Sequence, residues 1–98
     1  MRTFEEIKRA IEIHREELIS KFKVKEIGIF GSYARGEQDE TSDIDILVDY
    51  SDEYISLFDV LDLKYYFEGL LGLNVDIVIR EALKPVIGKR IMDEVVFV

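Results

Sequence analysis

A glycine–serine pair and an aspartate pair stand at a fixed spacing near the middle of this chain. Gly31 and Ser32 are followed by ten residues and then by the segment Asp43-Ile44-Asp45. The glycine comes after a short apolar run, residues 26–30, which predicts a buried strand that ends where the chain turns. A glycine at such a turn lets the backbone approach a ligand closely. We expect Ser32 to cap a short helix whose free N–H groups face outward, so the turn is suited to hold a phosphate.

The aspartate pair lies in a segment with the alternation of a β-strand. Asp43 and Asp45 share one parity of residues 43–49, and isoleucine and valine side chains take the other. A strand therefore places both carboxylates on one face, about 7 Å apart along the chain. Two carboxylates this close repel each other unless one is protonated or a cation lies between them. An all-oxygen ligand set favours Mg²⁺, or Mn²⁺, over zinc.

Each half of this pattern also has an ordinary structural explanation. A glycine–serine turn is common, and an Asp-x-Asp segment is usually a solvated strand end. Their ordered co-occurrence is rarer: with residue usages of several per cent each, chance produces it in about one chain of this length in a thousand. Both halves also fall in a strand–turn–strand context, which is the confirmation that such a motif requires. The sequence therefore favours nucleotide chemistry.

The segments GSYARG and SDIDILV resemble those of the minimal nucleotidyltransferases, the shortest members of the DNA polymerase beta-like nucleotidyltransferase superfamily. The family pattern is Gly-Ser, a spacer, Asp-x-Asp and a third acidic residue on a later strand. Asp76, within the apolar run 73–79, matches the third acidic position. The resemblance spans about residues 3–98. It implies an α/β (α+β) fold, with a nucleotidyltransferase-like mixed β-sheet flanked by helices.

The resemblance also implies the residues of the site and their chemistry. Three carboxylates would be catalytic and would hold two Mg²⁺ ions: Asp43, Asp45 and Asp76. Gly31 and Ser32 would cradle the phosphates of the nucleotide. Arg35 fits two interpretations equally well, a phosphate contact or a surface ion pair with an acidic neighbour among residues 37–40. The expected reaction moves a nucleoside monophosphate, here AMP from ATP, to a hydroxyl acceptor and releases pyrophosphate.

The short length points to a partner protein. Larger members of the superfamily carry a helical domain that completes the nucleotide and acceptor pockets, and 98 residues leave no room for one. Minimal nucleotidyltransferases are commonly paired with small helical HEPN-type proteins in toxin–antitoxin systems, where AMP is added to a tyrosine of an RNase toxin. The resemblance thus implies an antitoxin that adenylylates its toxin. The alternatives are an antitoxin that acts by binding alone and a small-molecule nucleotidyltransferase with a helical partner subunit.

Charge and composition narrow the remaining function classes. The net charge is −8, and no basic stripe with interleaved aromatic residues occurs, which disfavours a long nucleic acid as partner. The absence of cysteine excludes a disulfide scaffold and fits an intracellular protein. No apolar run reaches membrane-spanning length, and residues 1–6 do not resemble a signal peptide. We expect one cytoplasmic domain, residues 1–98, without a membrane partner; a homo-oligomer is compatible with the sequence.

Apolar residues at helical spacing predict the elements around the sheet. Residues 4–22 are expected to form one amphipathic helix opened by a Thr-x-x-Glu capping box, with His14 as a boundary residue rather than a metal ligand. A second helix is expected over residues 55–71, and Pro85 predicts the first turn of a third. Residues 95–98 are expected to form an edge strand or a docking tail.

The second predicted helix is apolar around much of its circumference, which is more than one sheet-facing stripe requires. Apolar residues left over after a helix has covered its sheet usually meet another element or another chain. We therefore regard Phe58, Tyr65 and Tyr66 as candidates for a partner-binding surface. Packing in the core is the alternative for each of them.

Overall fold

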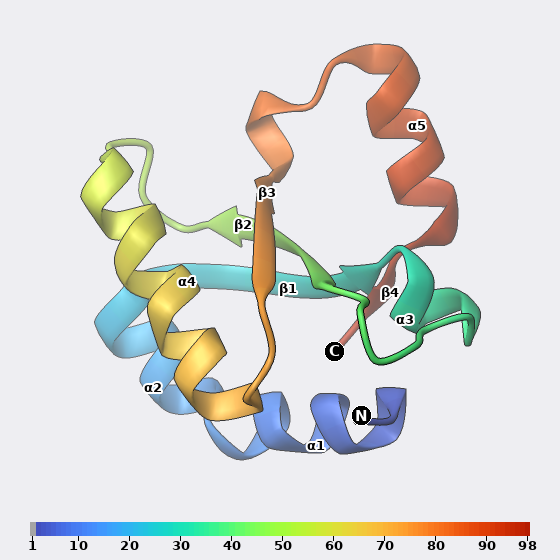
Figure 1. Cartoon of the computed structure of the whole chain (residues 1–98). Helices are drawn as coiled ribbons and strands as arrows, with labels where there is room; N and C mark the ends of the chain where they lie inside the picture. The colour runs from blue at the N-terminus through green and yellow to red at the C-terminus, as the bar shows by residue number, and fades with distance from the viewer. Residues whose placement is uncertain (1) are drawn as a thin grey trace.

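The computed structural model describes residues 2–98, and a sheet of four strands lies at its centre (Figure 1). The strands are β1 (Val24–Phe30), β2 (Ile44–Tyr50), β3 (Val75–Ile79) and β4 (Val96–Phe97). Their order across the sheet is β3-β2-β1-β4. Strand β1 runs antiparallel to β2 and β4, whereas β2 and β3 are parallel. The predicted mixed sheet is confirmed.

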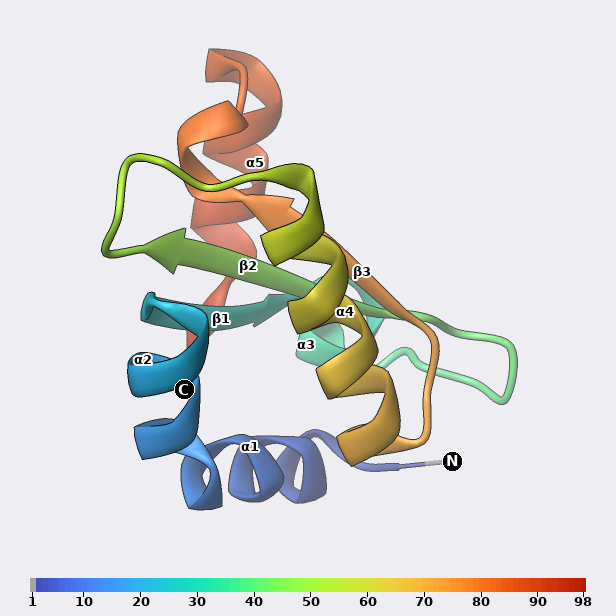
Figure 2. The same ribbon diagram turned by 90° about the vertical axis from the view of Figure 1, so that its left-hand side faces the viewer.

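Helices cover the two sides of the sheet unequally. Helices α1 (Phe4–Ile13), α2 (Arg15–Phe22) and α4 (Leu57–Leu71) lie on one side, and α5 (Pro85–Glu94) lies on the other (Figure 2). The core fills the space between the sheet and helices α1, α2 and α4, because the isoleucine and valine side chains of β1 and β2 point toward these helices. Its fully buried members include Ile7, Ile11, Leu18, Ile29, Ile44, Ile46, Val48, Leu63 and Phe67.

The predicted single helix over residues 4–22 is wrong, because the chain turns at His14 and forms two helices instead. The His14 ring nitrogen Nδ1 lies 2.9 Å from the Ala10 carbonyl oxygen, and the His14 backbone N–H bonds back into the end of α1. The half-buried ring also packs edge-on against Tyr66. The break lets α1 and α2 follow two different directions across the core (Figure 2). The intermediate burial of His14 agrees with the expectation that it lies between the surface and the core.

Helix α4 begins two residues later than predicted, because Ser56 and Asp59 form a capping box at its start. It ends at Gly72, which takes a left-handed conformation with φ 68°. Pro85 occupies the first turn of α5, and Val96–Phe97 forms the edge strand, so both of these predictions are confirmed. Within residues 2–98, no helix has the length and apolar character needed to cross a membrane.

The three residues on α4 that were candidates for a partner surface differ in their exposure. Phe58 and Tyr65 are 76% and 62% exposed, but Tyr66 is half-buried. The Tyr66 ring packs against Phe22 with centroids 4.8 Å apart, and against Phe67. Tyr66 therefore belongs to the margin of the core, because the end of α2 reaches it.

Candidate active site

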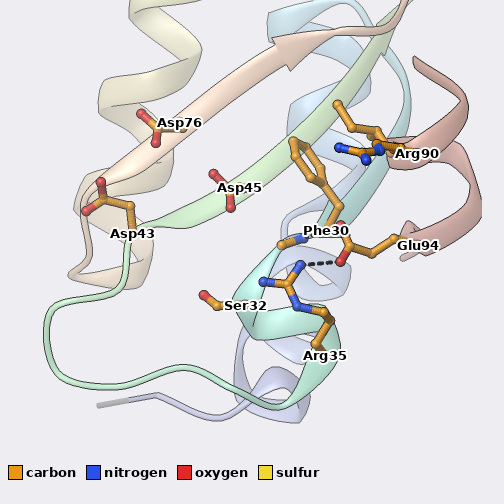
Figure 3. A pocket seen from close by; sticks show the side chains of 10 residues that line it. Phe30, Ser32, Arg35, Asp43, Asp45, Asp76, Arg90 and Glu94 are labelled. Atoms are coloured by element: carbon orange, nitrogen blue, oxygen red, sulfur yellow. Dashed lines mark hydrogen bonds and ion pairs between the residues drawn. The ribbon is translucent and has the colours of Figure 1, made fainter. Parts of the chain in front are cut away.

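A cleft of about 480 Å³ opens where the end of β1 meets the starts of β2 and β3 (Figure 3). The strand directions explain this meeting point: β1 runs antiparallel to β2, so it ends where β2 starts, and β3 starts there because it is parallel to β2. The short helix α3 (Ser32–Arg35) and helix α5 form the other walls. All six residues predicted from the sequence line the cleft: Gly31, Ser32, Arg35, Asp43, Asp45 and Asp76.

The register of the sheet brings the three aspartates together. Asp45 stands opposite Asp76 in the parallel pair of β2 and β3. Neighbouring strands lie about 4.8 Å apart, so the side chains of register partners project from the same face. The strand was expected to include Asp43, but β2 begins one residue later, so Asp43 directly precedes it. Figure 3 shows the three carboxylates along one wall of the cleft.

Gly31 lies so close to Asp45 that a side chain at its position would force the Asp45 carboxylate to move. A Cβ atom on Gly31 would stand 2.1 Å from Asp45 Oδ2, and the Gly31 φ angle is +75°, a region that favours glycine. Gly31 is also the residue that precedes α3, and Ser32 is the first residue of that helix. The prediction of Ser32 as the cap is therefore wrong, because the positive φ angle makes the turn at the glycine.

The sequence left two roles open for Arg35, a phosphate contact or a surface ion pair, and the structure shows the ion pair. The Arg35 Nε lies 2.9 Å from Glu37, within the predicted range 37–40, and its Nη1 pairs with Glu94. Glu94 also accepts a hydrogen bond of 3.1 Å from the Gly31 N–H. Arg35 also lines the cleft, so these ion pairs lie at the edge of the space that a ligand would enter.

Sequence reasoning missed the cleft residues that α5 contributes. These are Arg90, Ile91 and Glu94, and Phe30 at the end of β1 joins them. Arg90 and Glu94 are four residues apart, which places them on one face of the helix. That spacing was visible in the sequence, but nothing local showed that this face of α5 meets Gly31.

Burial and like charges raise the pKa of Asp45 to about 6. Burial has the largest effect, followed by the charges of Asp76 and Asp43; Glu94 adds to the shift and Arg35 opposes it. The protein thus concentrates negative charge at the half-buried Asp45 without enough positive charge to balance it. A bound cation would relieve this repulsion.

The donor set fits a metal ion that is bound together with a phosphorylated ligand. Within residues 2–98, no three His, Cys, Asp or Glu side chains converge closely enough to hold a metal ion by themselves. Mg²⁺ is usually bound through one or two carboxylates, with substrate phosphates and waters completing its octahedral shell. The aspartate oxygens of the cleft are ligands of this type, so a closed cage of protein ligands is not required.

Comparison with known proteins identifies the family. The family model described as "Nucleotidyltransferase domain" matches residues 11–98. This chain belongs to that family. It is a nucleotidyltransferase, and its six predicted site residues lie within the matched region.

Relatives of this nucleotidyltransferase agree with that assignment. The protein adenylyltransferase MntA of Thermococcus cleftensis is 50% identical over 98 residues, which cover 100% of this chain and 98% of the relative. A solved minimal nucleotidyltransferase has a TM-score of 0.82 at 35% identity and covers 97% of this chain and 95% of its own. A toxin–antitoxin structure with AMP-PNP matches with a TM-score of 0.73 at 25% identity, over 93% of this chain and 70% of that one.

The raised pKa of Asp45 predicts how the stability of the metal-free nucleotidyltransferase depends on pH. Its carboxyl holds a proton more tightly in the folded state, with a pKa of about 6, than in the unfolded chain, where the value is 3.8. Its contribution to stability is complete below about pH 4 and is lost as the pH rises through about 6. After solvent screening we expect a loss of about 1 kcal/mol. Urea unfolding between pH 4 and pH 7 measures it.

Asp45→Asn should abolish this pH-dependent loss, so the variant is expected to be more stable than the wild type at pH 7 and nearly equal at pH 4. Asp43→Asn serves as a control, because it removes an exposed carboxylate next to the same strand and should have a smaller effect. A marked loss of stability in Asp45→Asn at pH 7 would instead give this carboxylate a structural role.

The close contact of Gly31 with Asp45 predicts different costs for two glycine substitutions. Gly31→Ala should destabilise the protein by about 2–4 kcal/mol, because strain at φ 75° and ψ −153°, a conformation that essentially only glycine adopts, adds to the clash with the carboxylate. Gly36→Ala should cost only about 1 kcal/mol, since Gly36 has φ +72° but no atom within 4 Å of its Cβ position. Chemical denaturation measures both values, and equal losses would show that the contact with Asp45 is unimportant.

Proposed function

We propose that this nucleotidyltransferase uses Mg²⁺ to move AMP from ATP to a tyrosine hydroxyl of a HEPN-type toxin, and that it thereby acts as an antitoxin. The observation that carries the proposal is the meeting of Asp43, Asp45 and Asp76 with the Gly31–Ser32 turn in one cleft. The 50% identity to a protein adenylyltransferase supports AMP transfer. The likeness to a toxin–antitoxin structure with AMP-PNP supports a toxin partner and an adenine nucleotide. The HEPN class comes from the family resemblance, and the cysteine-free sequence fits action in the cytoplasm.

The chain's own residues would bind and orient the triphosphate. Gly31 and Ser32 line the cleft, and the Ser32 hydroxyl and the Gly31 backbone would contact the phosphates that leave as pyrophosphate. Arg35 would add a guanidinium, which suits phosphate oxygens in geometry and charge. Asp43 and Asp45 would hold Mg²⁺, with Asp76 available to a second ion. A bound Mg²⁺ neutralises charge on the phosphate oxygens.

The transfer step would be a displacement at the α-phosphorus. The tyrosine oxygen forms a bond to that phosphorus, and the bond to the oxygen bridging to the β-phosphate breaks. Pyrophosphate leaves with the bonding electron pair, and the proton of the hydroxyl passes to a carboxylate. Asp76 is exposed beside Asp45 and would take this proton or act as a ligand of the second ion. Positioning and charge neutralisation would supply most of the catalysis.

An antitoxin that acts by binding alone needs no such cleft. The burial and the repulsion that together raise the pKa of Asp45 are a cost to the fold, and binding to a toxin gives no reason to keep them. A small-molecule acceptor with a helical partner subunit would use the same carboxylates. The toxin–antitoxin likeness favours the protein acceptor over it.

The first test of the proposed function is joint binding of metal and nucleotide. Calorimetry with Mg²⁺ and α,β-methylene ATP, which cannot release pyrophosphate, should show binding to the wild type and none to the Asp43→Asn, Asp45→Asn double variant. Asp49→Asn is a matched control, because Asp49 shares the strand and parity of Asp45 but lies at the other end, paired with Arg80. Failure of all four common nucleoside triphosphates to bind, with Mg²⁺ or Mn²⁺ and the partner present, would contradict the proposal.

The second test concerns the toxin. Co-expression with a HEPN-type toxin should add the mass of AMP to a toxin tyrosine and protect the cell, as intact-mass spectrometry and growth would report. The Asp43→Asn, Asp45→Asn double variant should lose the added mass and the protection together. A double variant that still neutralises the toxin without any added mass would favour inhibition by binding.

A further inference from the structure

The carboxylate of Glu94 reaches from the end of α5 to the turn at Gly31 (Figure 3). One of its oxygens accepts the hydrogen bond of 3.1 Å from the Gly31 N–H, and the other pairs with the Arg35 guanidinium. These bonds, that of Arg35 first, lower the pKa of Glu94, so the group is charged at neutral pH. The protein thus supplies its own anion to a backbone N–H and a guanidinium, and both groups belong to residues that line the cleft.

Carboxylate and phosphate oxygens accept hydrogen bonds from the same donors, and Arg binds both ions through its planar fork. Gly31 has only one N–H to donate. A phosphate that approached while Glu94 was in place would also meet the negative charges of Glu94 and Asp45 at short range. The two anions therefore compete for one position.

Helix α5 packs loosely against the rest of the protein, which allows Glu94 to move away from Gly31 and Arg35. Gly88 is the only buried residue among those described in the helix. Val86 and Ile87 are 77% and 57% exposed, so little apolar surface holds this element against the sheet. Elements with few buried apolar contacts open at low free-energy cost.

We propose that Glu94 is a further residue of the nucleotide site, whose carboxylate occupies the anion position at Gly31 and Arg35 until a phosphate of the nucleoside triphosphate replaces it. The inference rests on the proposed function, because it requires that a triphosphate enters this cleft. When the Glu94 carboxylate leaves, its negative charge no longer repels the incoming phosphate, and Arg35 becomes free to pair with that phosphate. Glu94 thereby sets the apparent affinity for nucleotide.

Nucleotide affinity in matched variants tests the competition. In calorimetric titrations of α,β-methylene ATP with Mg²⁺, Glu94→Gln should bind about three- to tenfold more tightly than the wild type, because more molecules have a free anion position. Glu37→Gln is the control: it also removes one negative charge and one ion pair of Arg35, but Glu37 does not line the cleft. We expect its affinity to stay within about twofold of the wild type.

A combination with Arg35→Gln separates competition from a general effect of charge. If Glu94 competes for Arg35, the gain from Glu94→Gln should shrink when Arg35 is absent. A gain of equal size in both backgrounds would show an effect of charge alone and would overturn the proposal. Adenosine, which has no phosphate, should bind to all variants alike.

The Gly31 amide reports the exchange in the unaltered protein, even if a variant fails to fold. Its nuclear magnetic resonance signal should shift when α,β-methylene ATP and Mg²⁺ are added, because its acceptor changes from a carboxylate to a phosphate. Nucleotide binding with an unchanged Gly31 signal, or weaker binding by a folded Glu94→Gln, would overturn the inference and leave the proposed function intact. The absence of nucleotide binding in every protein would overturn both.

Discussion

Gly31 and Asp45 touch so closely that no Cβ atom fits between them, and the site depends on this contact. The contact joins the turn suited to a phosphate, at the end of β1, to the carboxylates at the start of β2. It exists because β1 and β2 are antiparallel and Phe30 stands opposite Asp45 in their register. A glycine at the next position then brings the backbone against the carboxylate. The parallel pairing of β2 with β3 adds Asp76 to the same place.

The second property of the site is unbalanced negative charge. Burial and two neighbouring aspartates raise the pKa of Asp45 to about 6, so the fold keeps a group that costs stability at neutral pH. Active sites commonly keep such groups, since the same charges that weaken the free protein bind the ligand. Glu94 contributes to this excess of negative charge, because it pairs with Arg35 and so neutralises a nearby cation of the cleft.

Several predictions from the sequence were correct because they depended on local patterns. Alternating polarity placed Asp43 and Asp45 on one face, and the glycine after an apolar run marked the turn. The prediction of one helix over residues 4–22 also depended on a local pattern, and it was wrong. Ile7, Ile11 and Leu18 keep one helical period through the break, so their spacing did not show that the chain turns at His14. The cap at Ser32 was wrong because local preference for serine does not reveal a positive φ angle at the preceding glycine.

The sequence by itself determined which residues meet in the cleft: the spacing of Gly31, Ser32, Asp43 and Asp45 is readable along the chain, and the family resemblance adds Asp76. It also determined the class of fold, because apolar periodicity marked the strands and helices and the family resemblance implied that the strands form a mixed sheet. Only the tertiary structure decided that Glu94 and Arg90 join this site and that Glu94 binds Gly31 and Arg35. Those contacts join segments about sixty residues apart in the chain. They follow from the packing of α5 beside the cleft, and such packing leaves no periodic or local signal in the sequence.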